Sequence, residues 1–100
     1  MNHGDFKVAS SVRINLPSHI FKGGPWTHLA TITRSLSEYV VLLKSPSPED
    51  PEPRIYLEQI TATGRFVQIE DDSLWNDLVY FATSKGLTGE VAGKEIVIAR

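Results

Sequence analysis

The clearest local signal in the chain is a helix that the sequence marks at both ends. Asp71, Asp72 and Ser73 precede an apolar pattern with three- and four-residue steps, and carboxylates placed there accept first-turn amide hydrogen bonds and complement the helix dipole. Lys85 falls in the last turn, and Gly86 follows where a left-handed cap is wanted. The sequence therefore predicts a helix over residues 74–85, with Trp75 and Val79 at the margins of a core face made of Leu74, Leu78, Phe81 and Ala82.

Three further segments have the alternation or composition of β-strands. Residues 6–16 alternate between apolar and polar side chains with period two, until Pro17 removes a backbone donor and ends the pairing. Residues 39–43 and 96–99 are short apolar runs with β-branched side chains, which suit pleated surfaces better than helices. The sequence predicts a strand in each segment, and we expect the first and last strands to lie at edges of the sheet.

Two more strands are predicted to pair as an antiparallel hairpin. Residues 54–61 and 65–70 each alternate in polarity, and Thr63 and Gly64 lie between them with the composition of a tight turn. Glycine adopts positive φ without steric cost, so we expect Gly64 to take that conformation.

Residues 26–36 fit two descriptions. Leu29, Ile32 and Leu36 fall at helical steps, whereas Thr31 and its β-branched neighbours favour a strand. The helical alternative would give the order β-α-β-β-α-β of the ferredoxin-like fold. In both alternatives the fold class is α+β, with a mainly antiparallel sheet that has one face covered by the helix at 74–85.

The 100 residues are enough for one hydrophobic core, so we expect a single domain over residues 1–100. Residues 45–53 carry four prolines at nearly alternate positions together with three acidic residues, which predicts a stiff connecting loop in extended geometry. Such prolines are also typical of segments that dock in aromatic grooves, but a flanking cation at the usual offset is missing.

Composition excludes several classes of function. The chain has no cysteine, which excludes disulfides, thiolate metal sites and cysteine nucleophiles and is compatible with a cytoplasmic location. No apolar run approaches the roughly 20 residues that cross a bilayer, so we expect a soluble protein with no membrane partner. The net charge is −2 and the basic residues are spread singly, which disfavours binding to nucleic acid.

No catalytic residue, metal site or cofactor is predicted. His3, His19 and His28 are spaced too irregularly for a local metal motif. The acidic run at residues 70–72 is placed for helix capping and lacks the spacing of a calcium loop. The serines and glycines form neither a nucleophile elbow nor a phosphate-binding loop.

These exclusions favour a non-enzymatic binding or accessory protein that acts through protein–protein contacts, with another protein or a second copy of the chain as partner. The candidate contact residues are Trp26 and His28, which lie close together in the sequence, Trp75 at the edge of the helix, and Val97 in the terminal strand.

The alternative is a small enzyme or ligand-binding domain with a pocket on the concave face of the sheet. Its site would assemble from separated residues, of which His28, Glu38 and Glu58 are the candidates.

Overall fold

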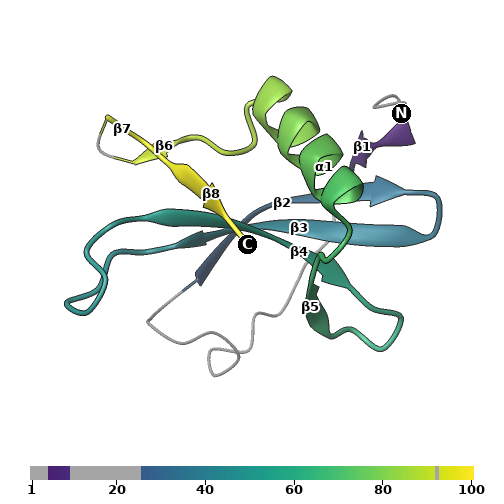
Figure 1. Cartoon of the computed structure of the whole chain (residues 1–100), viewed down its shortest axis with the longest axis horizontal. Helices are drawn as coiled ribbons and strands as arrows, with labels where there is room; N and C mark the ends of the chain where they lie inside the picture. Colours follow the sequence, from purple (N-terminus) through teal and green to yellow (C-terminus); the bar gives the residue numbers. More distant parts are fainter. Residues whose placement is uncertain (1–4, 10–25, 92) are drawn as a thin grey trace.

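A computed structural model describes residues 5–9, 26–91 and 93–100 and shows an open, mainly antiparallel sheet with one helix packed on it (Figure 1). The α+β fold class is therefore confirmed. The helix is α1 (Asp72–Ser84), and the strands are β1 (Lys7–Val8), β2 (Trp26–Arg34), β3 (Ser37–Lys44), β4 (Arg54–Ile60), β5 (Phe66–Gln68), β6 (Glu90–Val91), β7 (Lys94–Glu95) and β8 (Val97–Ala99).

Residues 26–34 form a strand, so the ferredoxin-like order is not adopted. β2 runs antiparallel to β3 along its whole length, and a two-residue turn joins them. The β-branched side chains of β2 fit this pairing, and the apparent helical spacing of its apolar residues has no counterpart in the structure. At the turn, Ser35 takes a φ of 53° and Leu36 is fully exposed.

β3 and β4 occupy the centre of the main sheet. The strand order is β1-β2-β3-β4-β5, and β8 also pairs with β4. The predicted hairpin is confirmed: β4 and β5 are antiparallel, and Gly64 in their connection has a φ of 82°. Of the predicted strand at 6–16, Lys7–Val8 is strand β1, and residues 10–16 lie outside the described part of the chain.

One edge of β4 is shared by two strands. Glu58–Ile60 pair with β5 in antiparallel fashion, whereas Arg54–Tyr56 pair with β8 in parallel. The predicted terminal strand is thus present as β8. β6 and β7 form a separate two-stranded ribbon directly before it.

The capping signals predicted at both ends of the helix are confirmed, but α1 begins at Asp72, two residues before the predicted start, and Lys85 is its C-cap and not part of its last turn. The side chain of Asp71 accepts hydrogen bonds from the amides of Ser73 and Leu74 at 2.9 and 3.2 Å. At the other end Gly86 has a φ of 70°, and the Leu87 amide donates to the Ala82 carbonyl at 2.9 Å. Together with the bond from the Gly86 amide to the Thr83 carbonyl, this is a Schellman motif.

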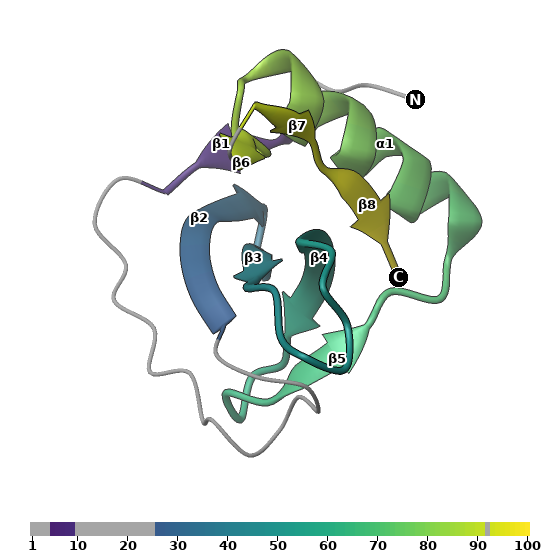
Figure 2. The same ribbon diagram turned by 90° about the vertical axis from the view of Figure 1, so that its left-hand side faces the viewer.

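The core lies between α1 and the face of the sheet that it covers. In Figure 2, seen nearly along the strands, the sheet curves around this core and α1 lies across its open side. The buried side chains come from every layer: Phe6, Ala30, Ile32, Tyr39, Val41, Ile55, Leu57, Ile69, Trp75, Leu78, Phe81, Ala82 and Ile96.

The structure differs from the sequence prediction at the first turn of α1. Trp75 is only 8% exposed and belongs to the core, whereas Leu74 is half-buried at its margin. The large indole ring reaches the core from the edge of the apolar stripe, and Arg100 lies over it. In the described residues, no helix has the length and apolar character needed to span a membrane.

Candidate functional site

The sheet has a second face, opposite α1, which we call the outer face. Along β3, Tyr39 and Val41 join the core beneath α1, so the alternate residues Val40 and Leu42 point to the outer face. Residues paired directly across neighbouring strands point to the same side. The strand register therefore identifies the other members of the outer face.

Two cross-strand rows on the outer face hold most of the candidate residues. Register pairs join Trp26 to Lys44, Lys44 to Arg54, and Arg54 to Val97. The neighbouring row runs from His28 through Leu42 and Tyr56 to Ala99 in the same way. Trp26, His28 and Val97 thus share one face of the sheet. Trp75 lies in the core on the opposite side.

An irregularity in β2 sets the position of His28. The register shifts between His28 and Ala30, so Leu29 is an extra residue. This bulge brings His28 and Thr31, three positions apart, to the same face, where the Nε2 of His28 and the Oγ1 of Thr31 are hydrogen-bonded at 2.8 Å. The hydrogen bond gives His28 a structural partner and fixes the orientation of its ring.

Aromatic and cationic side chains are neighbours on this face. The rings of Trp26 and Tyr56 meet edge to face with their centroids 4.8 Å apart. Lys44 and Arg54 lie in the row that begins with Trp26. The Lys44 side chain is only 5% exposed, whereas that of Arg54 is 36% exposed.

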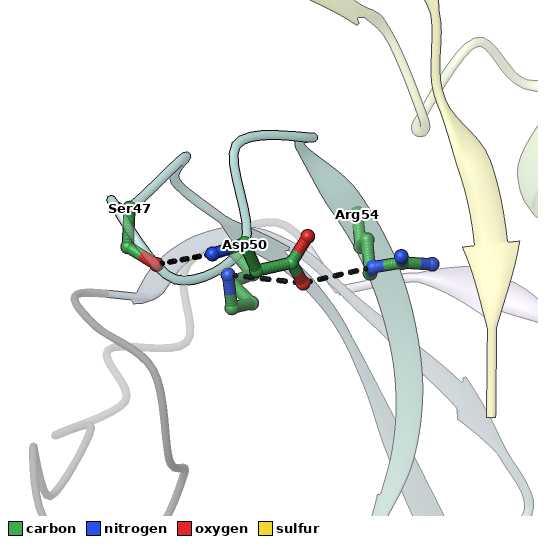
Figure 3. Close-up of polar contacts among 4 residues, drawn as sticks. Ser47, Asp50 and Arg54 are labelled. Carbon is green, nitrogen blue, oxygen red and sulfur yellow. Dashed lines mark hydrogen bonds and ion pairs between the residues drawn. The ribbon is translucent and has the colours of Figure 1, made fainter.

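Asp50, in the proline-rich loop, connects these two cations. Its Oδ2 lies 3.4 Å from the Nζ of Lys44 and accepts a hydrogen bond from the Nε of Arg54 at 3.1 Å. Ser47 holds the loop in this position, because its Oγ accepts a hydrogen bond from the Asp50 amide (Figure 3). The Ser47 carbonyl accepts from the same amide. The hydrogen bond from Arg54 lowers the pKa of Asp50 below its ordinary value.

The residues of the alternative ligand pocket also point to the outer face. Glu38, Val40 and Leu42 alternate along β3, and Glu58 pairs with Val40. Glu58 is buried, and this burial raises the pKa of its carboxyl above the ordinary value. Among the described residues no three histidine or acidic side chains group as metal ligands would.

A groove borders β8. Its volume is about 480 Å³. It is lined on one side by Glu95 and Ile96 together with Val97 and Ile98 of β8, and on the other by Thr83 of α1 with Thr88 and Gly89. Val97 is 63% exposed. β8 pairs with β4 along one edge, and within the described part of the chain no strand pairs with its other edge.

The sequence predicted five of the outer-face residues as candidates, Trp26, His28 and Val97 for partner binding and Glu38 and Glu58 for the alternative pocket, but not the group around Asp50. The only local signal for that group is the spacing of Asp50 and Arg54, four residues apart in a segment interpreted as a connector. Lys44 precedes the loop and meets Asp50 only because the loop folds back.

Comparison of the chain with protein-family models, with curated protein sequences and with solved structures gives no match in any of the three.

Proposed function

We propose that this chain is a protein-binding module that takes up an extended segment of a partner protein along the unpaired edge of β8. The observation that supports this most is the combination of an edge strand with a groove beside it. An edge strand offers unpaired amides and carbonyls, and an added strand satisfies them with main-chain hydrogen bonds.

The groove offers side-chain contacts in addition to the few main-chain hydrogen bonds of the short edge. β8 has three residues, so its main chain alone offers few hydrogen bonds to a partner. Side chains of a bound segment would enter the groove and contact Ile96, Ile98 and Thr83. Alternate side chains of an added strand point to opposite faces, so one set would meet the groove and the other would lie beside Val97.

We favour a peptide segment over a second copy of the chain because of the size of the contact. Stable protein dimers bury about 1,200–2,000 Å² in total, far more than a three-residue strand supplies alone. An extended peptide in a groove needs a smaller surface, since it is narrow and contacts the groove along its length.

A selection of random peptides on the immobilised protein, followed by fluorescence anisotropy, tests the proposal. We expect selected peptides to have β-branched alternation and to lose more than about tenfold in affinity in Val97→Lys and in Thr83→Trp, which fills the groove from α1. Val8→Lys is the matched control, because Val8 is an exposed apolar residue on β1.

Light scattering over a concentration series distinguishes a peptide from a second copy of the chain as the occupant of the β8 edge. A dimer that Val97→Lys dissociates would identify a second copy as the occupant and contradict the peptide proposal. Two results would reject strand addition at β8. One is a monomeric protein that selects no peptide, and the other is a set of peptides whose affinity is the same for wild type and for both groove variants.

A further inference from the structure

We infer that Lys44 and Arg54 form a binding site for an oxyanion group, a carboxylate or a phosphate, which Asp50 occupies as an internal stand-in. Arg54 is the cross-strand neighbour of Val97, so the site adjoins β8, but the inference does not depend on the function proposed for the free edge of that strand. In this view the proline-rich loop at 45–53 is a competitor that an external anion displaces.

The state of the buried ammonium of Lys44 supports the site first. Ammonium groups have three donors, and burying them without acceptors is costly. The Nζ of Lys44 is inaccessible and has no hydrogen-bond partner among the described residues, and its nearest carboxylate oxygen, on Asp50, is 3.4 Å away. Since hydrogen bonds between ammonium and carboxylate groups are about 2.7–2.9 Å long, Asp50 is a poor hydrogen-bond acceptor for Lys44.

The balance of charge between Asp50 and the two cations also supports the site. One carboxylate faces two cations, and the same oxygen, Oδ2, approaches both of them. Arg54 uses its Nε for this contact, and its side chain is 36% exposed, so solvent reaches the guanidinium. An oxyanion that is not tethered to the loop can place separate oxygens on the two cations at normal distances, whereas Asp50 presents a single oxygen to both.

The position of Asp50 in the chain allows it to be displaced. It lies in a loop, and apart from these two cations the hydrogen bonds that hold it, with Ser47 and with the backbone of Glu52, are within the same loop. Displacing Asp50 therefore requires movement of the loop and leaves β3 and β4 paired. The exposed Glu49 and Glu52 would leave with it, which removes two further negative charges from the vicinity of the cations.

The surroundings suit a ligand that carries its anionic group on an organic body. Trp26 is the cross-strand neighbour of Lys44, and Tyr56 follows Arg54 on the same face. The contacting rings of these two residues provide an apolar wall beside the cations.

Titration of isotope-labelled protein with sodium phosphate and with sodium acetate, at constant ionic strength, tests the inference by NMR at the Arg54 Nε–H signal. Asp50 is tethered, so it competes at high effective concentration and wild type should bind weakly. We expect Asp50→Asn to bind one of the two anions at least about tenfold more tightly than wild type. The preferred anion assigns the site to phosphate or to carboxylate groups.

Two further variants control for general charge effects. Adding Lys44→Met to Asp50→Asn should abolish the gain. Asp72→Asn, which removes the carboxylate of another aspartate–arginine pair, should bind as wild type does. Equal gains in Asp72→Asn and Asp50→Asn would overturn the inference.

The wild-type titration keeps the inference testable if Asp50→Asn does not fold. Saturating anion should shift the Asp50 amide signal as the Ser47 contact is released. Anion titrations that move neither the Arg54 nor the Asp50 signal in the folded protein would refute the site.

Discussion

The guanidinium carbon of Arg100 lies 4.9 Å from the centroid of the Trp75 ring, and the Nη1 of Arg100 donates to the carboxylate of Asp72. This contact joins the residue after β8 to the first turns of α1. Arg100 also lies over the indole ring at the margin of the core, which helps to explain why Trp75 is buried although it lies beside the apolar stripe.

Replacing Arg100 with Ala should lower the free energy of unfolding by about 0.5–1 kcal/mol, the range of an exposed cation–π contact. Arg100→Lys should restore part of the loss, because an ammonium retains the charge but not the planar stacking. Urea unfolding followed by tryptophan fluorescence measures both effects. An Arg100→Ala variant as stable as wild type would show that the contact contributes nothing.

Leu78 is fully buried at the centre of the α1 face. Leu78→Ala should cost about 2–5 kcal/mol, because it removes transfer free energy and leaves a cavity. Asn76→Ala is the control on the same helix, since Asn76 is exposed and should change stability by less than about 0.5 kcal/mol. Equal midpoints for Leu78→Ala and wild type in thermal unfolding would contradict the core assignment.

Substitutions of Gly64 test whether the β4–β5 connection needs a residue with positive φ. A methyl group added at its Cα would meet no atom within 4 Å, so the cost of Gly64→Ala comes from the backbone alone. At a φ of 82° we expect a loss of about 1 kcal/mol, and a smaller one for Gly64→Asn, because Asn tolerates this region better. Calorimetry of the two variants should rank them in that order, and the reverse ranking would disprove the explanation.

Glu58 should make stability depend on pH. Burial raises the pKa of its carboxyl in the folded state, so the folded protein binds this proton more tightly than the unfolded chain does. The contribution of Glu58 is therefore neutral below the unfolded pKa of about 4.3 and becomes destabilising as pH rises through the folded pKa. Glu58→Gln should raise the free energy of unfolding at pH 7 and leave it nearly unchanged below about pH 4, measured by urea titration at both pH values.

Local signals in the sequence predicted α1 and the β4–β5 hairpin because the chemistry that ends these elements is local. Asp71 caps its own helix, and Gly64 supplies positive φ within its own turn. For residues 26–36 the pattern was ambiguous, since helix and strand both place Ile32 inside. The segment is a strand because it pairs with β3, and no local pattern in the sequence encodes that pairing.

The candidate site was predicted only in part for the same reason. Trp26 and His28 are conspicuous residue types, but their placement on one face with Val97 follows from the register of four strands. The bulge at Leu29, which turns His28 toward Thr31, has no sequence signature, because any side chain can occupy such a position.

The shared edge of β4 has a consequence for the order in which the molecule assembles. β5 meets β4 across a short turn, whereas β8 reaches it only after the hairpin, α1 and the β6–β7 ribbon have intervened. Closing the longer loop costs more chain entropy, so the parallel pair should form later and open more readily. Native-state hydrogen exchange should then find the amides of β8 less protected than those at the centre of β4. The strand that we propose as the binding site for a partner would thus be the first to separate from the sheet.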